Sequence, residues 1–490
     1  MAAHTGGNAL VSGVRAGCRR GAARRSAGGV RRAPGGRATA AGGAPSVSKD
    51  AWLAETIPTI TGDGALSNGH SGARAAALEA LRSLRVPTTR DEAYRFTDVS
   101  PIVQRQMSVP PGADAAVLAD AVAARPMEAA RGSTVVVVDG VVDANLTDLS
   151  SIPEGVYVGG AEGAPEDALA RVGELSNEMG GPFATLNTAT ARDAVFLVVP
   201  EGVVLEQPVH VLYLSTTSTD EGTPATSPRA LAVLGAGASA ELVEEFATVG
   251  DGAHLTTQVT EAHLAPRATL HHRYVELQAA PSFHLKLTAV HQAEESVYEH
   301  TEVRIGGQIS RQDLLIRQLG EATNTKMRHF VLTGEQQLHD LHSQLVLDFP
   351  RGEADQVHKC IVHGATGRGV FNGNVQVNRG AQQTDAGQLT RNLLLAPKAT
   401  VNALPNLQIV ADDVACTHGC AISDLEDEQL FYFRARGIDE DVARQALVYS
   451  FGLEVVAEIR QEELRKRCEA AVRASLGALA AAVPAGEDGA

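Results

Sequence analysis

The sequence predicts a mainly β protein with helical segments at both ends of the chain, and three observations lead to this fold class. From residue 133 onward, short runs typical of strands follow one another for nearly 300 residues, without long helices between them. Turn signals, among them Gly235, Pro266 and Gly306, separate these runs. Aromatic residues make up only 4% of the chain while Val, Leu, Ala and Gly are plentiful, and this balance suits stacked strands with small side chains.

Residues 1–47 have the composition of an organelle transit peptide, rich in Arg, Ala, Gly and Ser. The first 49 residues hold eight arginines and Lys49 but no acidic residue, so removing them changes the formal net charge from −16 to −16 − 9 = −25. The strongly negative charge of the rest of the chain disfavours the alternative that the first residues form a basic arm that binds nucleic acid. No run of about 18 apolar residues occurs, so we expect no transmembrane helix and a soluble mature protein.

Residues 48–131 are predicted to form an N-terminal helical domain. The segments "GARAAALEALRSLRVP" (72–87) and "ADAAVLADAVAARP" (113–126) space their apolar residues at helical intervals and stop before a proline. Between them, "DEAYRFTDVSPI" (91–102) is interpreted as an extended stretch that ends in a turn.

Residues 132–424 are predicted to form the β core, for which a sandwich, a set of barrels and a β-solenoid are the candidate architectures. An internal similarity favours the solenoid. The segments "LAPRATLHHRYVELQ" (264–278) and "LAPKATVNALPNLQI" (395–409) share a turn that leads into alternating residues, at a separation of 131 residues. A repeated turn before a repeated strand is what stacked coils require, because each coil buries its inner face only against its neighbours.

Residues 425–482 return to a helical pattern, and residues 483–490 are interpreted as a frayed tail. One helix is expected within 438–459, with Asp439 as its N-cap. Its apolar residues follow helical spacing, interrupted by Gly452, and they are Val442, Ala446, Leu447, Phe451, Val455 and Ile459. A further helix is expected from residue 460.

The stretch "DDVACTHGCAISDL" (412–425) contains the strongest candidate for metal or sulfur chemistry. In an extended strand, Cys416, His418 and Cys420 point to the same side as Val414 and Ile422. This parity alone favours a buried core for the cysteines, but a buried imidazole needs partners that a thiol supplies poorly. Two neighbours on that face, about 6.6 Å apart, could share one metal ion, whereas the two cysteines, about 13 Å apart, could not. The missing ligands must therefore come from another coil or another chain.

The remaining cysteines and histidines give weaker signals. Five cysteines are too few and too unevenly spaced for a disulfide framework, which indicates free thiols in a reducing compartment. Cys360, with His363 nearby, is a second candidate ligand, although a core cysteine is the preferred interpretation. Four further histidines are interpreted as solvated or hydrogen-bonded surface residues: His271, His272, His339 and His342. Neither a P-loop nor a G-x-S-x-G motif occurs, which argues against the enzymes that depend on them.

Residues 371–456, from "FNGNVQVNRG" to "YSFGLEVV", closely resemble the SufD family of the SUF iron-sulfur cluster assembly system. The segment "YRFTDVSPI" (94–102) is similar to an N-terminal segment of the same family. The similarity is dense over the last third of the chain and sparse before it. The cysteine-rich N-terminal cluster of the SufB paralogues is missing, which favours SufD over SufB.

The resemblance implies a right-handed parallel β-helix between helical ends, in a non-catalytic scaffold that forms a complex with SufB and the SufC ATPase. It implies that Cys416 and His418 lie at the SufB contact, where a transient iron-sulfur cluster forms between the subunits. Cys360 and Cys420 are tentative further ligands. The C-terminal helices would dock SufC, the only source of ATP chemistry, and the candidate contacts are Leu430, Phe431, Tyr432, Phe433 and Phe451. A homodimer is an alternative assembly. With the basic arm, the resemblance points to the chloroplast (plastid stroma), with the mitochondrion as the alternative.

Two other classes of function are open from the residues alone. A β-helix polysaccharide-active enzyme would need an acidic Ca²⁺ site or paired carboxylates on one outer face. Asp412 and Asp413 do not provide this pair, because adjacent residues point to opposite sides of a strand. A structural zinc protein would hold one zinc ion tightly in the isolated chain.

Overall fold

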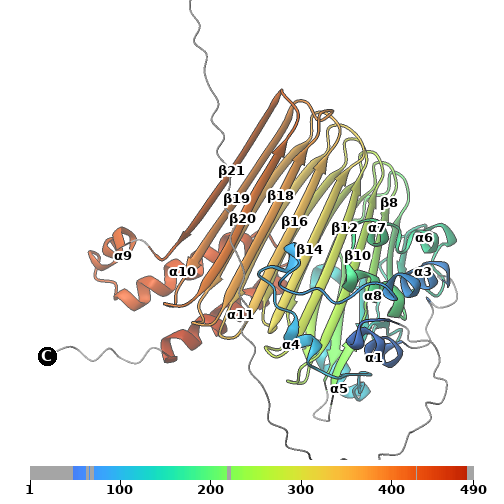
Figure 1. Ribbon diagram of the computed structural model, residues 1–490, viewed down its shortest axis with the longest axis horizontal. Coiled ribbons are helices and arrows are strands. Elements are labelled where there is room, and N and C mark those ends of the chain that lie inside the picture. Colours follow the sequence, from blue (N-terminus) through green and yellow to red (C-terminus); the bar gives the residue numbers. More distant parts are fainter. Residues whose placement is uncertain (1–47, 62–65, 67–70, 218–221, 426, 483–490) are drawn as a thin grey trace, which may run out of the picture. The chain divides into compact units, whose positions relative to one another are not determined.

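The computed structural model describes residues 48–61, 66, 71–217, 222–425 and 427–482. The predicted transit peptide and the predicted tail lie outside these described residues. The mainly β fold class is confirmed: a parallel β-solenoid is preceded and followed in the chain by helices (Figure 1). The predicted domain bounds at residues 131 and 424 stay predictions.

Two sheets make up the solenoid, and from β8 onward consecutive strands alternate between them. Each strand therefore pairs in parallel with the strand two positions later, and each coil adds one strand to each sheet. The eleven-stranded sheet contains β1 (Met107–Ser108), β4 (Tyr157–Gly159), β5 (Val195–Val199), β7 (Thr223–Thr226), β8 (Arg229–Leu234), β10 (Leu255–Leu264), β12 (Phe283–Gln292), β14 (Ile309–Gln318), β16 (Leu338–Leu347), β18 (Arg368–Val377) and β20 (Thr400–Ile409). The ten-stranded sheet contains β2 (Thr134–Val138), β3 (Val141–Val142), β6 (Val209–Thr216), β9 (Ser239–Val249), β11 (Thr269–Leu277), β13 (Val297–Ile305), β15 (Asn324–Thr333), β17 (Glu353–Val362), β19 (Thr384–Leu394) and β21 (Val414–Ser423).

The turns that lead from the eleven-stranded sheet to the ten-stranded sheet stack on one another. Five of them place a residue other than glycine in the left-handed region, with φ between 55° and 60°. The backbone N–H of each of these residues donates to a carbonyl of the next turn in the stack. Hydrogen bonds between coils therefore hold a backbone conformation that is otherwise strained. The five residues are Arg267, Glu295, Ala322, Arg351 and Gln383.

The internal similarity that favours the solenoid does not mark its true repeat. Residues 264–278 include the turn from β10 to β11, whereas residues 395–409 include the turn from β19 to β20, which crosses between the sheets in the opposite direction. The coil length is given instead by the stacked left-handed residues, which follow one another at intervals of 28, 27, 29 and 32 residues. The two similar segments thus occupy different places in the coil.

Short helices precede the solenoid or lie between its first strands. They are α1 (Ala51–Ile60), α3 (Ser71–Leu81), α4 (Ser100–Val103), α5 (Ala115–Ala123), α6 (Glu166–Arg171), α7 (Glu174–Met179) and α8 (Pro182–Thr190). The helices predicted within 72–87 and 113–126 are confirmed as α3 and α5. Among the described helices, none has the length and apolar character needed to cross a membrane.

The segment between α3 and α4 attaches the N-terminal region to the outer face of the eleven-stranded sheet. Instead of the predicted extended stretch, it forms a 3₁₀ turn (η1, Glu92–Tyr94), and α4 follows because Pro101 is accepted in the first turn of a helix. The guanidinium of Arg311 in β14 lies 4.0 Å from the ring centroid of Tyr94. The same guanidinium forms an ion pair of 2.6 Å with the buried Asp340.

The predicted C-terminal helices are present as α9 (Asp427–Arg434), α10 (Glu440–Val456) and α11 (Glu462–Ala482). Asp439 is the N-cap of α10, as predicted, and its side chain accepts a hydrogen bond from the N–H of Asp441. α10 and α11 pack on the outer face of the ten-stranded sheet, where their apolar side chains share one cluster with Phe330 and Ile361.

The buried face of α10 agrees with the predicted one only in part, since Val455 is buried as predicted. Val442 is 57% exposed, although the helical spacing places it on the apolar face, whereas Ala443 and Val448 are buried. Gly452 allows this arrangement, because a Cβ at this position would lie 2.5 Å from the ring of Phe330 in β15. The glycine that interrupts the helical pattern is therefore a point of close approach between α10 and the solenoid.

Candidate functional site

The predicted site lies on β21, the last strand of the ten-stranded sheet (Figure 1). Within the described part of the chain, β21 pairs with β19 alone, so one edge of β21 carries backbone N–H and C=O groups that face no neighbouring strand. His418 and Cys420 are exposed, and Cys416 is half-buried. The strand thus presents all three side chains where a second polypeptide can reach them.

Each of these three side chains continues a column of inward-facing residues from the coils below. The columns are His418 above Gln388 and Gln356, Cys420 above Thr390 and His358, and Cys416 above Ala386 and Ala354. His418 and Cys420 therefore end polar columns, whereas Cys416 ends an apolar column and packs against the largest core cluster. The predicted common face is the inner face of the solenoid, and it is exposed because no further coil covers it among the described residues.

The thiols of this strand are in their protonated form at neutral pH. Burial raises the pKa of Cys416, and the negative charge of Asp385 contributes in the same direction. Burial also raises the pKa of Cys420. Binding of a metal ion or of a sulfur species at these thiols would therefore release a proton, because the thiolate is the form that binds.

Cys360 is not brought together with these residues. It lies on β17, two strands before β21 and in the same column as Ile422, so roughly 10 Å of sheet separates it from β21. Its side chain is buried in a small apolar cluster, and burial raises its pKa to about 12. His363 points to α11, where it forms a hydrogen bond of 3.0 Å with Ser475. The surroundings of Cys360 are those of a core cysteine.

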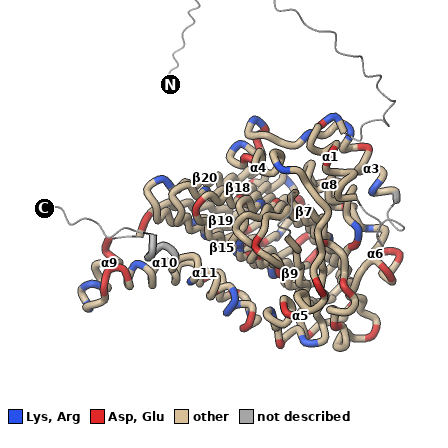
Figure 2. Tube along the Cα trace, turned by 90° about the horizontal axis from the view of Figure 1, so that it is seen from below, with Lys and Arg blue, Asp and Glu red and all other residues tan. Residues whose placement is uncertain are grey.

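The residues predicted to contact a partner on the C-terminal helices fall into two groups. Phe431 and Tyr432 of α9 are 72% and 55% exposed, whereas Leu430 is buried and Phe433 is half-buried. Phe451 of α10 faces the solenoid, since the ammonium of Lys359 lies 4.5 Å from its ring centroid. The exposed pair lines a shallow groove of about 490 Å³ on α9, and charged residues of both signs lie along this helix (Figure 2).

Sequence patterns missed a polar network that is buried inside the solenoid. His272 forms a hydrogen bond of 2.8 Å with the buried Glu244, so the surface position expected for this histidine is wrong. The surface position expected for His339 is wrong as well, since this residue is buried and its Nε2 donates to the carbonyl of Gly306 at 2.7 Å. Four of the buried histidines follow one another at intervals of 28, 29 and 29 residues, close to the length of one coil, and they are His272, His300, His329 and His358. This spacing is the signal that could have identified them.

Two family models match the chain. The model described as "SUF system FeS cluster assembly, SufBD core domain" matches residues 215–451, and the model described as "SufBD protein N-terminal region" matches residues 66–211. The first match includes the coils from β8 to β21, and with them the candidate site.

Several named proteins are similar to this chain. Protein ABCI7, chloroplastic, of Arabidopsis thaliana is 40% identical over 415 residues, which cover 82% of this chain and 85% of that protein. An iron-sulfur cluster assembly SufBD family protein of Synechocystis sp. is 32% identical over 423 residues, which cover 83% of this chain and 90% of that protein. The iron-sulfur cluster assembly protein SufD of Escherichia coli is 27% identical over 321 residues, or 64% of this chain and 76% of that protein. These matches give no support to the alternative of a polysaccharide-active enzyme. The chain therefore belongs to the SufBD family of the SUF iron-sulfur cluster assembly system, as a subunit of the SufD type.

Proposed function

We propose that this chain is a non-catalytic scaffold subunit of a SufBCD complex, in which it supplies ligands for a transient iron-sulfur cluster at the interface with a SufB-type paralogue. The observation that carries the proposal is the exposure of His418 and its neighbouring thiols on the uncovered end of the solenoid. The cluster is the cargo of the complex. His418 and Cys416 are the primary ligands proposed, and Cys420 is a further one.

The uncovered end has the properties of a sheet edge that a partner covers. β20 and β21 are ten residues long each and contain no Asp, Glu, Lys or Arg. Edge strands that must stay unpaired are commonly short or charged, because an uncharged edge pairs readily with another chain. Leu404, Ile409 and Ile422 are 38%, 44% and 44% exposed at this end. A paralogue with the same fold could continue both sheets by strand addition, and a homodimer through the same end is the alternative.

The ligand set supports a shared site. The two thiols stand about 13 Å apart along the strand, so His418 and one thiol are the most that β21 can direct to a single metal ion. Clusters held in proteins have complete sets of thiolate or imidazole ligands. A partner would therefore supply the remaining ligands, and a cluster held by two chains can be released when the chains move apart.

The groove on α9 is the proposed docking place of the SufC-type ATPase, through which alone ATP would act. Phe431 and Tyr432 are the exposed anchors there, and buried aromatic anchors contribute much of the energy of protein interfaces. α9 follows β21 directly in the chain, and α10 packs on β15 and β17. A movement of the ATPase could therefore reach the cluster site through a short connection.

The plastid stroma is the proposed location, with the mitochondrion as the alternative. The arginine-rich first 47 residues support an organelle, and the relative named as chloroplastic supports the plastid.

The test is cluster assembly by the complex of this chain with SufB-type and SufC-type partners under anaerobic conditions. His418→Ala should abolish the build-up of iron and sulfide while the subunits stay associated in size-exclusion chromatography. Thr417→Ala, on the opposite side of the same strand, is the matched control and should leave the yield unchanged. Cys416→Ser and Cys420→Ser, compared in the same assay, identify the thiol that binds. A normal cluster yield from His418→Ala would refute the site.

A further inference from the structure

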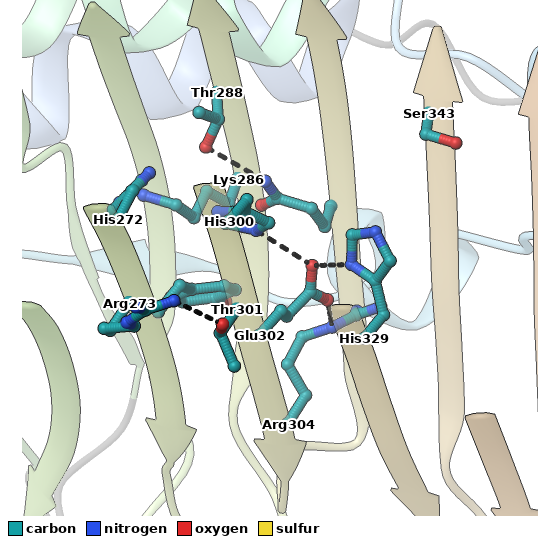
Figure 3. Close-up of polar contacts among 12 residues, drawn as sticks. His272, Arg273, Lys286, Thr288, His300, Thr301, Glu302, Arg304, His329 and Ser343 are labelled. Carbon is teal, nitrogen blue, oxygen red and sulfur yellow. Dashed lines mark hydrogen bonds and ion pairs between the residues drawn. The ribbon is translucent and has the colours of Figure 1, made fainter. Parts of the chain in front are cut away.

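A second cluster of metal-binding side chains lies deep inside the solenoid, on strands remote from β21. His300 and Glu302 of β13 and His329 of β15 each offer one ligand atom, and these atoms all lie within 4.8 Å of one another. All three residues are fully buried. Figure 3 shows their side chains converging from two neighbouring strands.

The distances between the ligand atoms fit a common ion. Nε2 of His300 lies 3.4 Å from Oε2 of Glu302, and Nδ1 of His329 lies 2.9 Å from the same oxygen. Ligands placed about 2.1 Å from an ion in a tetrahedral arrangement are about 3.4 Å from one another. One observed separation equals this value and the other is shorter, so the three side chains are already close to the positions that a bound ion requires.

Each candidate ligand is also held from its far side. Nδ1 of His300 lies 3.4 Å from the hydroxyl of Tyr298. Nε2 of His329 lies 3.2 Å from the side-chain nitrogen of Gln356. Arg304 donates a hydrogen bond to Oε1 of Glu302. Metal-binding histidines and carboxylates commonly have such partners, which fix the ring orientation and the tautomer. The atoms left facing one another are the three that a metal would take.

We propose that His300, Glu302 and His329 bind a first-row divalent cation, such as Fe²⁺, Co²⁺ or Zn²⁺, inside the solenoid. Two imidazoles and one carboxylate are a donor set that these ions accept. The proposal goes beyond the scaffold function and does not depend on it, because it concerns the isolated chain.

The existing ion pairs near the cluster are the main factor that opposes binding of a cation. Glu302 is paired with Arg304, and Glu244 with Lys286 at 2.8 Å, so the negative charges of these two buried acids are already neutralised. A divalent ion adds positive charge to a closed interior, which is costly unless direct bonds compensate for it. The three coordinate bonds must therefore supply the affinity, and removing any one of them should have a large effect.

Polar side chains connect the cluster to the uncovered end. Gln356, which contacts His329, accepts a hydrogen bond of 2.9 Å from Gln388, and Gln388 lies in register beneath His418. This row places polar side chains between the cluster and the uncovered end.

The test uses the full chain purified without partner subunits, under anaerobic conditions, with Co²⁺ as the probe. The background chain carries His418→Ala, Cys416→Ser and Cys420→Ser, so that the ligands of β21 cannot contribute. This chain should bind one Co²⁺ with visible d–d absorption and without a thiolate-to-metal charge-transfer band. Adding Glu302→Gln or His329→Gln should weaken binding by roughly tenfold or more. His284→Gln changes another fully buried interior histidine and should leave binding unchanged.

Two results would overturn the proposal: a background chain that binds no Co²⁺, or equal binding by the chain with Glu302→Gln. Should the ligand variants fail to fold, as judged by circular dichroism, anomalous diffraction from the Co²⁺-loaded background chain decides. A peak between the three side chains supports the site, and a peak elsewhere or no peak contradicts it. Either failure is distinguishable from a failure of the scaffold function, which is read as cluster yield on the complex.

Discussion

β10 and β21 are strands of the same stack, each of ten residues, and they have opposite environments. Nine residues of β10 are buried, whereas none of β21 is. β10 has β8 and β12 as neighbours and α8 packed against it, whereas β21 has β19 alone among the described strands. Burial in a solenoid therefore comes from the neighbouring coils as much as from the composition of the strand. An end without a further coil exposes the side chains that an inner coil would bury.

The loss of stability on removal of a polar side chain should differ most between the inner coils and β21. Glu244→Ala removes the carboxylate that pairs with the fully buried Lys286 at 2.8 Å, and an unpaired buried charge should lower the free energy of unfolding by about 3–5 kcal/mol. Thr417→Ala, on the exposed β21, should change it by less than about 0.5 kcal/mol. Urea denaturation of both variants measures the contrast, and similar losses would contradict it.

The pH dependence of stability should differ between the face of the solenoid that α11 covers and the exposed α9 end. Burial alone would raise the pKa of Glu245, but hydrogen bonds from His210 and from Arg467 of α11 outweigh it and lower the pKa to about 2. A carboxylate with a lowered pKa stabilises the fold above its unfolded pKa, near 4.3, and this contribution, roughly 3 kcal/mol, is lost as the pH falls from there toward 2.

Arg467→Met should therefore reduce the loss of stability between pH 5 and pH 3, as followed by thermal unfolding. Arg434→Met, which removes the exposed ion pair of Arg434 with Glu440 at the α9 end, should leave the pH dependence as it is. If stability depends on pH in the same way for the wild-type chain and for Arg467→Met, the ion pair of Arg467 with Glu245 does not stabilise the packing of α11.

The same substitution at two glycines of the C-terminal helices should change the stability of the chain in opposite directions. Gly452→Ala forces a Cβ against the ring of Phe330 and should cost about 1–3 kcal/mol of stability. Gly477→Ala meets no atom within 4 Å and should gain up to about 1 kcal/mol. Thermal melting of both variants tests the contact, and a gain from Gly452→Ala would show that α10 does not lie close on β15.

The smallest effect on stability is expected at the uncovered end itself. Ile422→Glu places a charge on a residue that is 44% exposed, so the unfolding free energy of the isolated chain should change by less than about 0.5 kcal/mol. Association with the SufB-type partner should nevertheless weaken by roughly tenfold or more, because an unpaired charge would be buried in the interface. Val109→Glu, which is 60% exposed in the N-terminal region, is the control for binding. Unchanged affinity of Ile422→Glu would place the interface elsewhere.

The sequence predicts those parts of the fold that depend on local patterns. The helical spacing that ends before a proline locates α3 and α5, and the acidic first turn after Asp439 locates the start of α10. The coil repeat is hidden because residues such as Arg267, Glu295 and Ala322, rather than glycine, take the left-handed turn positions. Their backbone N–H groups donate to carbonyl groups of the next coil, which stabilises these positions, and no local pattern records such a contact.

The candidate site was predictable only in part, because its environment also depends on the neighbouring coils. Strand parity places Cys416, His418 and Cys420 on one face, and that face is the inner face. Parity cannot tell whether another coil lies above, so it favours burial for residues that the end of the stack exposes. The buried cluster of His300 and His329 was missed because its members join only when coils stack.

The most direct test of the account is hydrogen exchange of the backbone amides of β21, measured with and without the SufB-type partner. In the free chain we expect fast exchange for those amides of β21 that face away from β19, because no strand covers them. Binding of the partner should slow their exchange to that of the inner strands, while amides on α5 stay unchanged. If the complex forms and the β21 amides exchange as fast as before, the uncovered end of the solenoid is not the assembly interface.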